Sequence, residues 1–134
     1  MNDKKAILLR EAKRVAKNAY TLSGFRVGVA VSANGRIFTG ANIENASLGL
    51  SVCAERVALA TAVSAGCRNI KAIAVACVDA HKNSPLEERV PCGACRQWIA
   101  ELAPKADIFI AGSNHVLTID DLLPIPFRFG KNKT

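Results

Sequence analysis

Two short cysteine-bearing segments constrain this chain more than any other feature, because the fold has to bring them together. The first is Cys53-Ala54-Glu55-Arg56, and the second has the sequence PCGACRQ and runs from Pro91 to Gln97. Together they contain three thiols and one carboxylate. A catalytic zinc commonly takes three protein ligands and keeps its fourth position for water. The two segments therefore predict a Zn²⁺ site formed by Cys53, Cys92 and Cys95.

The surroundings of these cysteines suit a catalytic metal. Glu55 follows Cys53 by two residues, close enough to exchange a proton with water at the metal without binding the metal itself. Both segments are expected to begin helices, where unpaired backbone N–H groups stabilise thiolates. Cys92 and Cys95 would then share a helix face. Three thiolates bring excess negative charge, and Arg56 and Arg96 supply positive charge beside them.

Length and composition favour a cytoplasmic enzyme with one catalytic domain over residues 1–134. No apolar run approaches the ~20 residues of a membrane helix, so no membrane partner is expected. The start of the chain lacks the apolar stretch of a secretion signal. The five cysteines are an odd number, which argues against a fully paired disulfide framework.

The net charge of +7 raises the alternative of a nucleic-acid-binding or base-editing protein. The chain has one Trp, one Tyr and five Phe, too few for a platform on which bases stack. A solvated helix face explains much of the charge, and we expect no nucleic-acid partner. The basic residues of that face are Lys4, Lys5, Arg10, Lys13, Arg14 and Lys17.

The hydrophobic pattern alternates between helical and strand spacing. Apolar residues repeat at helical spacing over residues 3–20. Asn34-Gly35 is a strong hairpin turn between strands expected at 25–31 and 36–41, and residues 42–51 should form a loop. The other expected elements are helices at 52–65 and 91–104, strands at 70–78, 107–111 and 116–119, a polar loop at 79–90 and a helical turn at 120–124. This order predicts one layered α/β domain.

Two other uses of the cysteines have to be considered. A closed four-cysteine zinc module would need Cys67 or Cys77. Cys67 lies about 21 Å from Cys53 along one helix at ~1.5 Å per residue, and Cys77 is embedded in an apolar strand. Thiol redox chemistry at Cys92-Gly93-Ala94-Cys95 would leave Cys53 and Glu55 without a role.

A Cys-x-Glu followed by Pro-Cys-x-x-Cys resembles the signature of zinc-dependent nucleoside and nucleobase deaminases. The wider pattern resembles the short, homotetrameric cytidine deaminases. The resemblance implies a three-layer α/β/α fold with a mixed five-stranded sheet, a nucleoside substrate and a role in pyrimidine salvage. The further segments that carry it are Ser23-Gly24-Phe25-Arg26-Val27-Gly28, Gly40-Ala41-Asn42-Ile43-Glu44-Asn45-Ala46-Ser47 and Leu122-Leu123-Pro124.

The resemblance also implies substrate-binding residues. Asn42 and Glu44 match the pair that holds the ribose 3′-hydroxyl, and Phe25 matches an aromatic residue that packs on the pyrimidine. Phe127 matches a residue that reaches the site of a neighbouring subunit.

Backbone groups and one arginine complete the implied site. The N–H of Ala54 would meet the base carbonyl, and the carbonyl of Val90 would meet the departing amino group. The arginine that matches Arg56 would bond two ligand sulfurs, those of Cys53 and Cys92.

The activity implied is hydrolytic deamination of cytidine and 2′-deoxycytidine to uridine and 2′-deoxyuridine, with release of ammonia. Zinc would activate water while Glu55 shuttles protons. Leu22 and Leu48 stand where the family usually has tyrosines, and the loop at 79–90 is longer than is typical. These departures keep open a deaminase of another cytosine compound, such as blasticidin S.

Overall fold

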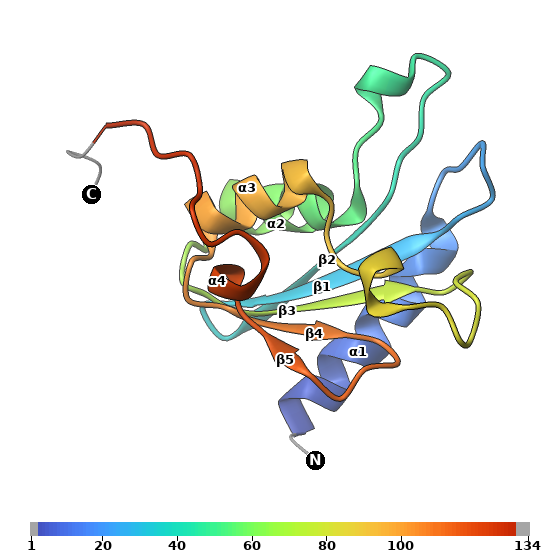
Figure 1. The fold of residues 1–134 in the computed structure, drawn as a ribbon. Coiled ribbons are helices and arrows are strands. Elements are labelled where there is room, and N and C mark those ends of the chain that lie inside the picture. The colour runs from blue at the N-terminus through green and yellow to red at the C-terminus, as the bar shows by residue number, and fades with distance from the viewer. Residues whose placement is uncertain (1–2, 131–134) are drawn as a thin grey trace.

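The computed structural model describes residues 3–130 and shows a five-stranded sheet covered by helices on both faces (Figure 1). The strands lie in the order β2-β1-β3-β4-β5. β3 and β4 are parallel, and the other neighbouring pairs are antiparallel, so the mixed sheet is confirmed. The strands are β1 (Val27–Ala33), β2 (Arg36–Ala41), β3 (Ile70–Cys77), β4 (Asp107–Ile110) and β5 (Val116–Leu117).

The helices form the two outer layers that the resemblance implied. α1 (Asp3–Val15) packs on one face of the sheet, and α2 (Ala54–Ser64) and α3 (Gly93–Leu102) pack on the other. The short α4 (Ile119–Leu122) follows β5 and contacts α3. Within residues 3–130 no helix combines the length and apolar character needed to cross a membrane.

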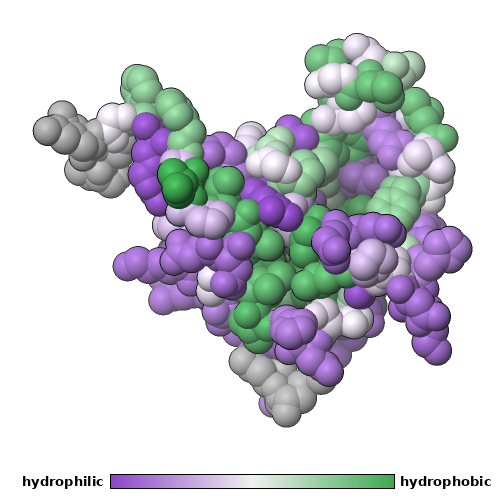
Figure 2. Space-filling view, in the orientation of Figure 1, coloured by the Kyte–Doolittle hydropathy of each residue, from purple (hydrophilic) through white to green (hydrophobic). Residues whose placement is uncertain are grey.

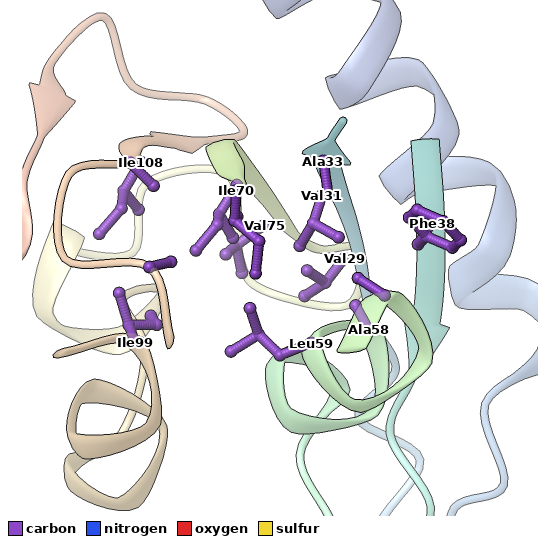
Figure 3. Packing of buried hydrophobic residues seen from close by; sticks show 14 of the residues in the cluster. Val29, Val31, Ala33, Phe38, Ala58, Leu59, Ile70, Val75, Ile99 and Ile108 are labelled. Atoms are coloured by element: carbon purple, nitrogen blue, oxygen red, sulfur yellow. The ribbon is translucent and has the colours of Figure 1, made fainter. Parts of the chain in front are cut away.

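The core is divided between the two faces because side chains alternate along each strand. Val29 and Val31 of β1 point toward α2, where they meet Leu59 (Figure 3). Ala30 of the same strand faces α1 and packs with Leu8. Burial of both faces of β1 explains why six of its seven residues are buried.

Two glycines allow the helices to lie directly on the sheet. A Cβ on Gly28 would come 1.9 Å from the backbone oxygen of Ala12 in α1. A Cβ on Gly40 would come 2.4 Å from the backbone nitrogen of Ala58 in α2. Gly40 therefore allows the close packing of α2 on the sheet, and Cys53 directly precedes that helix.

The predicted elements are present, with shifted ends. The hairpin turn is confirmed, since Asn34 and Gly35 both have positive φ, of 52° and 75°. The first α-helix stops at Val15 and tightens into a 3-10 turn over Ala16–Asn18. The helical segment does not reach residue 20, because Tyr20 pairs with Ile43 in a β-bridge. The last strand ends at Leu117, because Thr118 caps α4 instead.

Candidate active site

Three sulfur atoms meet where the N-termini of α2 and α3 converge. Cys53 and Cys92 directly precede these helices, and Cys95 lies in the first turn of α3. Sγ of Cys92 lies 3.7 Å from Sγ of Cys53 and 3.5 Å from Sγ of Cys95, and all three sulfurs lie within 4.8 Å of one another. Tetrahedral zinc with bonds of ~2.3 Å holds its sulfurs ~3.8 Å apart. The cluster therefore fits Zn²⁺.

The remaining two cysteines do not join this cluster. The buried Cys67 receives a hydrogen bond from Nη1 of Arg36 at 3.7 Å. The Cys77 thiol donates to the carbonyl oxygen of Arg89 at 3.8 Å. Among residues 3–130 only Cys53, Cys92 and Cys95 form a potential metal site, so a zinc held by them would have its fourth position available for water.

Two of the three thiols, those of Cys53 and Cys95, share a hydrogen bond that favours one thiolate. A hydrogen bond from Cys95, aided by the Arg56 guanidinium, lowers the pKa of Cys53 to about 5. The same bond to Cys53, together with burial, raises the pKa of Cys95. A bound zinc would replace the shared proton and hold all three groups as thiolates.

Arg56 donates from Nη2 to Sγ of Cys53 at 3.7 Å. That bond raises the pKa of Arg56, and the sulfur of Cys95 raises it further. The bond to Cys53 is one of the two that the resemblance implied, and a second bond to Cys92 remains a prediction. Nε of Arg56 is buried and finds no hydrogen-bond partner among the described residues.

Glu55 is buried beside the three sulfurs, with 5 % of its surface exposed. Burial raises the pKa of its carboxyl group to about 7, and the nearby negative charge of Cys53 adds to the effect. A carboxyl group with a pKa near neutrality can both accept and release a proton. Its position and chemistry therefore suit a proton shuttle.

A cavity of about 240 Å³ opens beside the cysteine cluster. Its walls contain seven residues that the sequence analysis had selected for the site. They are Phe25, Asn42, Glu44, Cys53, Ala54, Glu55 and Val90. Residues more than sixty positions apart in the chain therefore surround one space, which is of a size to hold a small molecule.

Asn42 and Glu44 organise the backbone on one side of this cavity. The Asn42 side chain accepts a hydrogen bond from Val27 N at 2.8 Å and donates one to Phe25 O at 2.9 Å. The Glu44 carboxylate accepts bonds from the N–H groups of Leu22 and Ser23 at 2.6 and 2.8 Å. Both side chains retain further hydrogen-bonding capacity for a ligand.

The structure adds three residues to the cavity wall that sequence reasoning missed, namely Val27, Cys77 and Glu88. Cys77 packs against the hydrophobic core, as its apolar strand predicts, and it also borders the cavity. Burial, aided by the charge of Glu55, raises its pKa to about 11. Glu88 belongs to the long loop at 79–90. Its place two residues before Val90 was the one sequence feature that could have indicated a position in the cavity wall.

Arg96 holds the second cysteine segment in place. Its Nε donates to Pro91 O and its Nη1 to Leu122 O, both at 2.8 Å. The guanidinium thereby links the backbone before Cys92 to the end of α4. The sequence shows that Arg96 follows Cys95, but it does not show that Arg96 bonds to Leu122, 26 residues further along the chain.

Phe127 lies outside the cavity formed by the described residues of one chain. Its side chain is 71 % exposed. The Gln97 side chain holds its backbone, with Nε2 donating to Phe127 O at 2.8 Å and Oε1 accepting from Phe127 N at 3.2 Å. The ring therefore projects from the surface, and its predicted role in a neighbouring site remains a prediction.

Comparison with known proteins agrees with this geometry. The family model described as "Cytidine and deoxycytidylate deaminase zinc-binding region" matches residues 2–111. A cytidine deaminase of Halalkalibacterium halodurans is 42 % identical over 127 residues, which covers 90 % of this chain and 92 % of that protein. A cytidine deaminase of Sporosarcina psychrophila is 40 % identical over 126 residues, with 90 % and 88 % covered.

A solved structure extends the likeness to three dimensions. The crystal structure of a cytidine deaminase from Burkholderia pseudomallei matches with a TM-score of 0.80 and 39 % identity, covering 95 % of this chain and all of that one. The sequence motifs, the three-layer fold and the cysteine cluster thus agree. The chain belongs to the cytidine and deoxycytidylate deaminase family.

Proposed function

We propose that this protein hydrolyses cytidine and 2′-deoxycytidine to uridine and 2′-deoxyuridine. Water adds at C4 of the ring, and the 4-amino group leaves as ammonia. The observation that carries the proposal is the buried Glu55 carboxyl group, which lies beside three zinc-ligand thiols and lines a nucleoside-sized cavity. The similar proteins named above are cytidine deaminases, which supports the same substrate class.

The residues of the chain divide the chemistry among them. When bound, Zn²⁺ supplies the positive charge that makes water a nucleophile at neutral pH. Glu55 takes a proton from that water, passes it to N3 of the ring and later helps to protonate the leaving amine. The Ala54 N–H and the Val90 carbonyl orient the base, and Phe25 packs on its face. Asn42 and Glu44 hold the ribose 3′-hydroxyl.

The enzyme works as a homotetramer in this proposal. Large apolar side chains project from the turn at 48–50 and from the C-terminal segment (Figure 2). Leu48 is 80 % exposed and Ile125 is 90 % exposed. Exposed apolar patches of this kind mark protein contacts. Subunit contacts would cover them and bring Phe127 to a neighbouring site.

The proposal also includes the cellular location, the metabolic role and the domain organisation of the enzyme. All five cysteines are free thiols, which fits the reducing cytoplasm. The reaction serves pyrimidine salvage, because it returns a cytosine nucleoside to the uridine pool. A single catalytic domain over residues 1–134 carries it.

A panel of cytosine compounds tests the substrate, with loss of the 4-amino group followed by absorbance. Zinc-loaded protein should convert cytidine and 2′-deoxycytidine with higher kcat/KM than blasticidin S, free cytosine or a cytosine-containing oligonucleotide. A higher kcat/KM for blasticidin S or for the oligonucleotide would overturn the nucleoside assignment. Failure of every compound in the presence of bound zinc would overturn the deaminase function.

A further inference from the structure

A second cavity, of about 360 Å³, extends from Cys77, which it shares with the active-site cavity, to α1. It forms where β3 and β4 end, between the loop at 79–90 and Lys13 of α1. The other cationic or titratable residues in its wall are Cys77, His81, Lys82 and Arg89. Among the described residues that line it, none is acidic. Basic groups from α1 and from both ends of the loop thus surround one space.

Arg89 is held in this cavity by backbone rather than by a carboxylate. Its Nη1 donates to the carbonyl oxygen of Ala111 at 2.9 Å. Gly112, with φ of 87°, allows the close approach, because a Cβ there would lie 2.5 Å from Nη1 of Arg89. Nε of Arg89 is buried without a hydrogen-bond partner in residues 3–130. The guanidinium is therefore fixed while part of its donor capacity is unused.

The acidic residues near these basic groups in the sequence do not line this cavity. Glu88, which precedes Arg89, borders the active-site cavity, and Glu87 lies in neither wall. Asp79, at the start of the loop, is engaged by Arg26, whose Nε and Nη2 donate to it at 2.9 and 2.8 Å. Glu11 of α1 receives two bonds from Arg14, at 3.0 and 2.7 Å. Asp79 and Glu11 are thus each paired with an arginine, and the side chains that line the cavity are basic or uncharged.

We propose that this basic cavity, defined by Lys13, His81, Lys82 and Arg89, binds a phosphate group, either as inorganic phosphate or as the phosphate of a nucleotide. A fixed guanidinium and flanking ammonium groups match the charge and the acceptor geometry of phosphate. The cavity also lies beyond the carboxyl ends of two parallel strands, a frequent place for ligands in α/β proteins. The proposal goes beyond the deaminase reaction and does not depend on it.

Calorimetric titration of the zinc-loaded protein at constant ionic strength tests the site. Inorganic phosphate and adenosine 5′-monophosphate should both show saturable binding, and adenosine should show none. If adenosine 5′-monophosphate binds at least about tenfold more tightly than phosphate, the natural ligand is a nucleotide. If the two affinities are equal, the natural ligand is inorganic phosphate. Absence of saturable binding by both anions, or equal binding of adenosine, would overturn the proposal.

Paired variants place the binding in this cavity. The double variant Lys13→Gln/Lys82→Gln should weaken phosphate binding at least about tenfold, because charge-assisted bonds are lost. The control Lys71→Gln/Lys105→Gln removes the same net charge from exposed positions outside this cavity and should bind phosphate like wild type. Arg89→Met should abolish binding. Arg89→Met also removes a bond that holds the loop, so the two lysine double variants provide the decisive comparison. If both double variants weaken phosphate binding equally, or if neither weakens it, the proposed site is wrong.

Discussion

Nη2 of Arg56 lies 3.7 Å from Sγ of Cys53, and this contact joins the first turn of α2 to the cysteine cluster. The bond helps to lower the pKa of Cys53, so the arginine favours the thiolate that a metal requires. With zinc bound, three thiolates and one divalent ion leave an excess of negative charge. Arg56 draws part of that charge from the sulfurs.

Replacing Arg56 tests this electrostatic role. Arg56→Ala should reduce zinc affinity or activity by about 10–100-fold, as is typical when a group that supports a metal ligand is lost. Arg56→Lys should lie between alanine and wild type, because an ammonium keeps the charge but lacks the guanidinium geometry. Zinc content by mass spectrometry, together with kcat/KM, checks the order. Three indistinguishable proteins would refute the charge-balance argument.

Glu55→Gln should keep the fold and the zinc but lose at least ~10²-fold in kcat. The amide is nearly isosteric with the carboxyl group and fills the same buried position, yet it cannot carry a proton. Zinc content and circular dichroism provide the controls, and single-turnover rates provide the readout. Retention of more than about a tenth of the wild-type rate would show that Glu55 has another task.

Asn42 tests how the cavity wall is built. Asn42→Ala removes the two hydrogen bonds that tie the end of β2 to Phe25 and Val27. Since Asn42 is buried, the unfolding free energy should fall by about 1–3 kcal/mol, and KM should rise because the Phe25 segment loses its support. Asn45→Ala, a change at an exposed loop position, is the matched control. Urea unfolding and steady-state kinetics measure both effects, and an unchanged KM would separate Asn42 from substrate binding.

The pairing of Arg26 with Asp79 predicts a specific acid sensitivity. Hydrogen bonds from Arg26 lower the pKa of Asp79 from 3.8 to about 2. The folded pKa lies below the unfolded one, so the stabilisation is fully present above pH 3.8 and is lost as the pH falls toward 2. The stability difference between wild type and Asp79→Asn should therefore be constant near neutral pH and shrink below pH 3.8. Urea unfolding of both proteins across this range checks it, and a difference that does not vary with pH contradicts it.

The sequence predicted the elements from local chemistry. It predicted the cysteine cluster from two local motifs, although Cys53 and Cys92 are 39 residues apart. Alternation along β1, the Asn34-Gly35 turn and the Cys92-x-x-Cys95 spacing need no knowledge of distant contacts. The early end of α1 was missed because the bridge from Tyr20 to Ile43 is a long-range pairing.

The parts of the site that escaped prediction depend on tertiary position. Cys77 and Glu88 have no motif, and they reach the cavity only because β3 and the following loop end beside α2. The internal bonds of Asn42 were equally invisible, since its motif suggested only a ligand contact. The surroundings of Arg89 depend on Gly112, which is 23 residues away in sequence.

The final prediction concerns Phe127, whose exposed ring cannot complete the cavity of its own chain in the conformation described. If the ring serves a neighbouring subunit, Phe127→Ala should lower kcat/KM, while Ile125→Ala in the same segment should have little effect. Unfolding and refolding a mixture of Phe127→Ala with the inactive Glu55→Gln variant creates sites that combine an intact Glu55 with a partner's intact Phe127. Activity should then exceed the sum of the two separate proteins, and light scattering should show tetramers. A mixture no more active than that sum, in confirmed mixed tetramers, would place the action of Phe127 within its own chain.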